Sequence, residues 1–226
     1  MNKVYQLAIN LLAVALGGLT SPVLAQTVDN LDLSPEIIED SPVFQRWLEK
    51  VPNVLEDIRN KPSFATRLRL GYSVFPSNDG VGGINLGIED VFLGKTGLTM
   101  SADYQTSFNG DRMSVGTSLH YFVFPLGSYI NIAPVVGYRY LETENYATDG
   151  VNVGARLMLA FSRTGAGDIS LTQSFVSPGG SEEVGLTTLA VGYAVTKELR
   201  LSVDLQKQNT RKAKDSRVGL VFEWLL

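Results

Sequence analysis

Residues 217–226 read RVGLVFEWLL, and this stretch decides the fold class. From Val218 to Leu226 an apolar residue occupies every second position, and Gly219, Val221, Glu223 and Leu225 lie between them. Successive side chains of a β-strand point to opposite faces, so a period of two predicts a strand with one apolar face. An unpaired apolar strand is a site of aggregation, and we therefore expect it to be paired on both edges in a closed barrel.

The same alternation recurs along the chain from residue 63 onward. We identify ten runs, each about as long as a tilted membrane strand: 64–74, 84–91, 98–108, 113–124, 129–141, 151–162, 169–176, 184–195, 199–208 and 217–226. In the run 184–195 the apolar positions change phase, which predicts a bulge near Thr187 and Thr188. The pattern predicts an all-β fold: an antiparallel up-and-down barrel of about ten strands over residues 63–226.

Charged residues sort by face. The apolar face of the runs carries no Asp, Glu or Arg, and its one lysine, Lys207, falls at the end of a run. The opposite face holds the residues that we predict to line the lumen: Arg67, Arg69, Glu89, Asp103, Arg139, Arg156, Arg200, Asp204 and Glu223. A soluble barrel with its apolar face inward would give the same alternation, so periodicity alone does not decide which face is outside.

Three further features favour an apolar face that meets lipid. Aromatic residues gather towards the ends of the runs, as in girdles at headgroup level; we place Phe64, Tyr121, Phe161 and Trp224 at one rim and Tyr72, Tyr138, Tyr140 and Phe175 at the other. The second face is rich in Gly, Ser, Thr and Asn, which suits a narrow polar interior. Tight turns at 92–97, 125–128 and 196–198 alternate with looser segments at 142–150, 177–183 and 210–215, which predicts short turns on one side and longer loops on the other.

The last strand also carries a family resemblance. Its spacing polar–x–Gly–x–x–aromatic–x–aromatic resembles the terminal assembly signal of outer-membrane β-barrel proteins, and is filled by Arg217, Gly219, Phe222 and Trp224, with Leu226 on the same apolar face as the aromatic residues. The resemblance implies a bacterial outer-membrane location, contact with outer-membrane lipid, and recognition by the outer-membrane assembly machinery.

The N-terminal part has a different character. Lys3, an apolar core at 7–19 and small residues before Gln26 predict a signal peptide over 1–25, cleaved after Ala25. Residues 26–62 predict a periplasmic helical segment, because Val43, Trp47 and other apolar residues recur at helical spacing over 42–60. We expect that helix to pack on a neighbouring surface. The alternatives are a plug or cap at the periplasmic mouth, a helix on the membrane surface, and an element that docks an envelope partner.

Few residues suggest a reaction. The only histidine, His120, shares a face with Ser118, and Asp103 is expected on the neighbouring strand. A Ser/His/Asp group could hydrolyse lipid or ester bonds; outer-membrane lipid hydrolases resemble this distantly but carry the order His-x-Ser, which is reversed here. The chain has no cysteine, which excludes disulfides and thiolate metal sites. We predict no metal, cofactor or nucleic-acid partner, since the net charge is only −4.

The sequence thus favours a small outer-membrane barrel with a narrow polar lumen, which serves a structural role or forms a pore for small solutes. The alternatives are the hydrolase built on Ser118, His120 and Asp103, and a soluble exported barrel that binds a small apolar ligand.

Overall fold

The computed structural model describes residues 41–42, 61–94, 96–211 and 213–226. The chain divides into two compact units, Met1–Pro52 and Asn53–Leu226, and all ten strands lie in the second. The predicted signal peptide over 1–25 lies outside the described residues, as does nearly all of the predicted helix over 42–60. Within the described part, no helix is long and apolar enough to cross a membrane.

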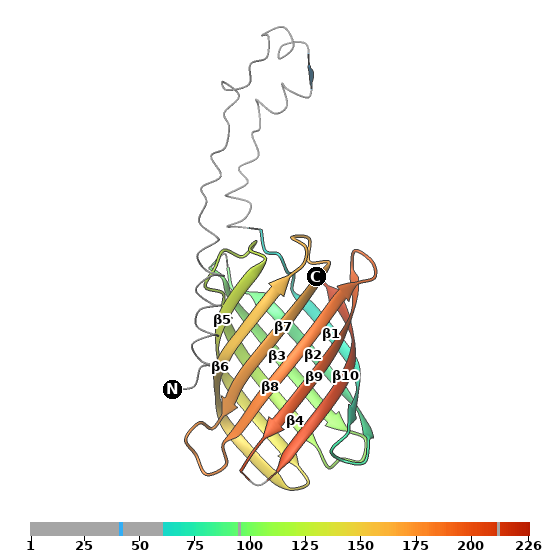
Figure 1. Ribbon diagram of the computed structural model, residues 1–226, viewed down its shortest axis with the longest axis vertical. Helices are drawn as coiled ribbons and strands as arrows, with labels where there is room; N and C mark the ends of the chain where they lie inside the picture. Colours follow the sequence, from blue (N-terminus) through green and yellow to red (C-terminus); the bar gives the residue numbers. More distant parts are fainter. Residues whose placement is uncertain (1–40, 43–60, 95, 212) are drawn as a thin grey trace, which may run out of the picture. The chain divides into compact units, whose positions relative to one another are not determined.

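Ten antiparallel strands form a closed barrel in which each strand pairs with its neighbours in sequence and β10 pairs with β1 (Figure 1). The strands are β1 (Arg67–Phe75), β2 (Val81–Phe92), β3 (Leu98–Ser107), β4 (Met113–Tyr121), β5 (Ile130–Thr143), β6 (Tyr146–Ala160), β7 (Gly167–Val176), β8 (Val184–Ala194), β9 (Leu199–Asn209) and β10 (Lys214–Leu225). The ten-stranded all-β barrel predicted from alternation is confirmed. Pairing of the terminal strand with β1 runs from Arg67↔Leu225 to Val74↔Val218, so the sheet has no free edge there.

The apolar side chains of the barrel face outward and the polar ones inward. In β1, Leu68, Leu70 and Tyr72 are each about half exposed, whereas Arg67 and Ser73 are buried. A soluble barrel would have the opposite arrangement, because water would cover the charged face. The alternative of a soluble exported barrel with an apolar ligand cavity is therefore wrong.

The predicted bulge in β8 is absent, and a bulge lies in β2 instead. The pairing of β8 with β7 and β9 is regular across Thr187 and Thr188. The apparent phase change arises because Val184 and Leu186 point into the lumen, where they join an apolar cluster with Leu141, Tyr146 and Val176. In β2 the register shifts between Ile88 and Val91, and Asp90 has a φ of 58°. This bulge turns Asp90 into the interior beside Glu89.

Two details at the rims also differ from the prediction. Phe64 does not join an outer girdle; it is 3% exposed and packs inside one end of the barrel with Phe122, Leu126 and Met158. The segment 142–150 is no loose loop, because β5 and β6 continue through it to a turn at Glu144 and Asn145. The longest connection, 122–129, lies at the end for which short turns are predicted, so loop length does not separate the two ends.

Candidate functional site in the barrel interior

A buried ion-pair network crosses the lumen near the end at which β1 begins. Arg67 on β1 lies 3.0 Å from a carboxylate oxygen of Asp90 on β2 and 3.1 Å from one of Asp168 on β7. Arg200 on β9 lies 2.8 Å from Asp168 and 3.2 Å from Glu223 on β10. Since β7 stands four places from β1 around the barrel, the Arg67–Asp168 contact spans the interior. The network and the cluster around Phe64 fill this end.

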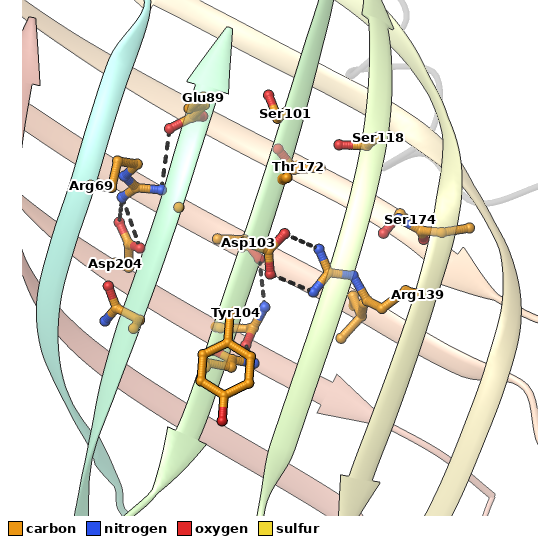
Figure 2. Close-up of a pocket in the computed structure, with 18 of the residues that line it drawn as sticks. Arg69, Glu89, Ser101, Asp103, Tyr104, Ser118, Arg139, Thr172, Ser174 and Asp204 are labelled. Atoms are coloured by element: carbon orange, nitrogen blue, oxygen red, sulfur yellow. Dashed lines mark hydrogen bonds and ion pairs between the residues drawn. The ribbon is translucent and has the colours of Figure 1, made fainter. Parts of the chain in front are cut away.

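A second layer of ion pairs lies further along the lumen. Arg69 contacts Asp204 at 2.8 Å, Glu223 at 3.1 Å and Glu89 at 3.2 Å; Figure 2 shows it between Glu89 and Asp204. Arg156 on β6 contacts the same Glu89 at 2.8 Å. Each carboxylate is shared between guanidinium groups, which compensates the cost of removing the charges from water.

Arg139 on β5 lies flat against the barrel wall. Its guanidinium group donates to the carboxylate of Asp103 on β3 at 2.8 Å (Figure 2). It also donates to the hydroxyl of Ser114 on β4 at 2.9 Å. Between these strands, β4 contributes Gly116, and a Cβ atom there would lie 2.6 Å from the Arg139 guanidinium carbon. The glycine therefore makes room for the arginine along the wall and keeps it out of the middle of the lumen.

The interior charges balance. Within the described residues, seven arginines form ion pairs with seven carboxylates inside the barrel: Arg67, Arg69, Arg112, Arg139, Arg156, Arg200 and Arg217 with Glu89, Asp90, Asp103, Asp168, Asp204, Asp215 and Glu223. Because each positive group has a negative partner within the lumen, the interior presents no strong field of one sign to a solute.

A cavity of about 150 Å³ remains between these layers. Ion pairs line one side of it: Arg69 with Glu89 and Asp204, and Arg139 with Asp103 (Figure 2). The rest of the lining combines neutral polar and apolar side chains with two further arginines. The neutral polar ones include Ser101, Ser118, Asn152, Thr172, Ser174, Thr188 and Gln206, the apolar ones include Leu86, Ile88, Val135 and Leu186, and the arginines are Arg156 and Arg217. Polar and apolar groups both contribute to the lining, and the cavity is open along part of its boundary.

The structure places all nine residues predicted to line the lumen on the inner side of the barrel. Eight of them have side chains that are at most 19% exposed; Asp103, at 43%, borders the cavity. Of the terminal-strand residues, Phe222, Trp224 and Leu226 face outward and are exposed, and Arg217 faces inward.

The three residues proposed as a catalytic group do not form one unit. The Ser118 hydroxyl lies 3.4 Å from Nε2 of His120, but Asp103 is held by both terminal nitrogens of Arg139. The carboxylate nearest to His120 is Asp90, whose Oδ1 lies 3.8 Å from Nδ1 and also contacts Arg156. Asp90 was missed. Strict alternation through 84–91 puts it on the apolar face, so the prediction that this face carries no Asp was wrong at this position, and the bulge turns the side chain inward.

Other interior groups also escaped sequence reasoning. Asp168 stands one residue before the run predicted to start at 169, and Arg112 stands one residue before the run predicted to start at 113. Asp215, which pairs with Arg112 at 2.8 Å, lies in the segment 210–215 predicted to be loose. A one- or two-residue extension of each run would have placed all three on the inner face.

Comparisons with known proteins bear on the fold. No family profile and no curated protein matches the chain. Among solved structures, the KdgM porin matches with a TM-score of 0.41 and 12% identity over 71% of this chain and 99% of the other. The NanC porin matches with a TM-score of 0.45 and 9% identity over 72% and 100%. Neisserial surface protein A matches with a TM-score of 0.25 and 12% identity over 73% and 97%.

The chain is similar to small outer-membrane β-barrels. At these identities the similarity concerns the fold alone, and the function has to be argued from the interior of this barrel.

Proposed function

We propose that this protein is a small outer-membrane β-barrel that acts as a narrow channel for small polar solutes. The observation that supports this most is a closed barrel whose exterior is apolar and whose interior holds paired charges around a partly open cavity of about 150 Å³. A barrel without a transport role would be free to fill this space with apolar side chains, as it does around Phe64 and Leu186.

The exterior supports a membrane location. Leu70, Val203, Leu205, Leu220 and other large apolar side chains stand 37–72% exposed around the barrel. Such a surface is costly in water, and a band of this kind is what hydrocarbon requires of a transmembrane barrel. Of the outward aromatic residues, Trp224 and Phe161 lie at one rim, whereas Tyr72 and Tyr138 lie away from the strand ends, opposite Leu220 and Val151.

One end of the lumen is blocked. The pairs of Arg67 and Arg200 with Asp168 cross one end of the lumen, and Phe64 and Phe122 pack beside them. Passage of a solute therefore requires these ion pairs to rearrange. Buried pairs with several partners break rarely, so we expect small and infrequent openings.

A structural role without conduction is the second candidate. It is favoured by the near-complete burial of Arg67, Arg200 and Glu223, each at most 2% exposed, which is how a permanent plug would look. The channel and the structural role differ in whether the ion pairs of Arg67 and Arg200 with Asp168 break to let a solute pass.

A lipid hydrolase is not favoured by the geometry. Ser118 and His120 face the lumen, inside a cavity of about 150 Å³ that is too small for a lipid acyl chain. Asp103 is committed to Arg139 and cannot orient His120. We therefore expect the wild type to show no lipid or ester hydrolysis in lipid vesicles, and His120→Ala to make no difference.

Planar-bilayer conductance of the purified protein tests the proposal. The double variant Arg67→Gln, Asp168→Asn removes one cross-lumen pair without changing the net charge, and Lys207→Gln, on the lipid side, serves as the control. We expect small events for the wild type and the control, and larger or more frequent events for the double variant. Silence of all three proteins would refute the channel and leave the structural role.

We further propose that the chain is exported with cleavage after Ala25 and inserted into the bacterial outer membrane. Gly219, Phe222 and Trp224 would serve as the signal to the assembly machinery, with the helix over 42–60 docking an envelope partner. Fractionation of cells that express the wild type and a Phe222→Ala, Trp224→Ala variant tests this proposal. Equal recovery of both proteins in the outer membrane would argue against the signal.

A further inference from the structure

A further ion pair crosses the lumen at the end of the barrel opposite the C-terminus, which we call the far mouth (Figure 1). Asp215 on β10 accepts hydrogen bonds from Nε and Nη2 of Arg112 at 2.8 and 3.0 Å. Arg112 lies in the connection between β3 and β4, and β4 stands four places from β10 around the barrel. Both residues are only 6% exposed, so the pair spans the interior at this mouth.

The pair stands between the cavity and the far mouth. Gln206 on β9 and Arg217 on β10 line the cavity of about 150 Å³. Gln208 and Asp215 occupy the next inward positions of the same strands towards the far mouth, and together with Arg112 they line a void of only about 10 Å³. The lumen therefore narrows at the Arg112–Asp215 pair.

Asp215 also holds a second hairpin connection. The hydroxyl of Ser77, between β1 and β2, donates to the Asp215 carboxylate, and the backbone N–H of Ser216 donates to the Ser77 hydroxyl at 3.0 Å. The Arg112 guanidinium group lies over the ring of Phe75, 5.4 Å from its centre. One carboxylate thus ties the β1–β2 and β3–β4 connections to the start of β10.

The other half of the far mouth is covered differently. Tyr146 at the start of β6 donates to Gln208 at 2.7 Å and packs with apolar side chains of β5, β7 and β8. These are Leu141, Val176, Val184 and Leu186. Because this cluster covers the mouth on the side of β5 to β8, the Arg112–Asp215 pair closes the side of β1 to β4.

The closure at the far mouth is weaker than the one at the opposite end. There, Arg67 has ion pairs with Glu89, Asp90, Asp168 and Glu223. Among the described residues Arg112 has an ion pair with Asp215 alone, and its Nη1 is buried without a hydrogen bond. Arg112 also lies in a connection, outside the strands. A connection can move while the strand ladder stays intact, and such local opening costs less free energy than unfolding of the barrel.

We propose that the Arg112–Asp215 pair is a gate at the far mouth. Release of the pair lets the 108–112 connection move away from the lumen and admits small molecules to the cavity, while the layer around Arg67 stays in place. The inference names the step that regulates access to the proposed channel, and its role in transport rests on that function. Access to the cavity can be measured whether or not the protein conducts.

The test places a single cysteine in the cavity, since the chain has none. Thr172→Cys on β7 puts a thiol on the cavity lining. Its rate of reaction with a water-soluble methanethiosulfonate, measured on the full protein in detergent micelles, reports access to the cavity. The gate variant is Arg112→Gln, Asp215→Asn, which removes both charges and so leaves neither buried alone.

Two comparison variants carry the same cysteine. Arg211→Gln removes an exposed arginine from the β9–β10 connection at the same mouth. Arg67→Gln, Asp168→Asn makes the matched double change at the opposite end. Asp215→Asn alone keeps an oxygen acceptor for Arg112 and replaces the gate variant if that protein does not fold.

We expect the gate variant to raise the rate of the thiol reaction about tenfold or more, and Asp215→Asn to raise it less. Arg211→Gln should leave the rate unchanged, and the change at Arg67 should raise it less than the gate variant does, because Arg200 and Phe64 still fill that end. An unchanged rate in the gate variant or in its replacement, or an equal rise in Arg211→Gln, would overturn the inference.

The same variants separate the gate from the channel. A faster thiol reaction in the gate variant of a protein that stays silent in planar bilayers would support the gate and refute the channel. Conductance with an unchanged thiol reaction rate would support the channel and refute the gate.

Discussion

The substitution Leu220→Arg tests whether the outer face of the barrel meets hydrocarbon. Leu220 lies near the middle of β10, is 45% exposed, and stands between Tyr72 on β1 and Val203 on β9, both outward-facing. Because its side chain points away from every interior contact, arginine can replace it without a steric clash inside the protein. Any loss of stability then reports the medium outside.

The magnitude differs sharply between lipid and water. An arginine at the bilayer midplane of a transmembrane barrel costs about 2–4 kcal/mol, which is a factor of roughly 30 to 800 in the folding equilibrium. The same change on a water-exposed strand stays within about 0.5 kcal/mol. Val195→Arg, at the turn after β8, is the control, since a charge near the interface costs at most about 1 kcal/mol.

The assay is reversible urea unfolding of the protein from lipid vesicles, followed by tryptophan fluorescence. We expect the free energy of unfolding to fall by at least about 2 kcal/mol for Leu220→Arg and by about half of that or less for Val195→Arg. A loss below about 0.5 kcal/mol for Leu220→Arg would show that this face does not lie in hydrocarbon.

The remaining predictions concern the interior. Gly116→Val should lower the free energy of unfolding by about 1–3 kcal/mol, because a Cβ at this position meets the Arg139 guanidinium. The control Thr117→Val, one residue away on the lipid side, should have little effect. Equal losses of stability in the two variants would argue against the close contact. Arg67→Leu should cost about 3–5 kcal/mol by leaving Asp90 and Asp168 short of a partner, and the paired variant Arg67→Gln, Asp168→Asn should cost less in the same urea titration. If the paired variant is the less stable, charge compensation does not hold this layer together.

Much of the barrel could be predicted because one physical constraint acts on nearly every strand position. The outward side chains of β1, β9 and β10 must be apolar, so their period of two survives without interruption from Leu68 to Val74 and from Leu199 to Leu205. The inner side has no comparable constraint. Because Val184 and Leu186 are apolar but face inward, the pattern of β8 was interpreted as a change of phase. Phe64 also faces inward, and its position near a strand end led to its prediction as a girdle residue.

The site was less predictable because it depends on pairing across the barrel. Sequence alternation predicts that Arg67 and Glu223 face inward. It cannot predict that Arg67 forms an ion pair with Asp168 across the lumen, because these two residues are 101 positions apart in the sequence. The inward position of the Asp90 side chain depends on a bulge with a positive φ. Nothing in the sequence Gly-Ile-Glu-Asp-Val predicts that bulge.

A spin-label scan of β10 tests the central claim most directly, and the absence of cysteine from the chain makes it practical. Single cysteines placed in turn at positions 218 to 224 would be labelled and the protein reconstituted in lipid vesicles, with collisions measured against oxygen, which dissolves in the bilayer, and a water-soluble nickel complex. The account predicts high oxygen accessibility at 218, 220, 222 and 224 and low values at 219, 221 and 223. High nickel accessibility at the even positions, or no alternation, would contradict it.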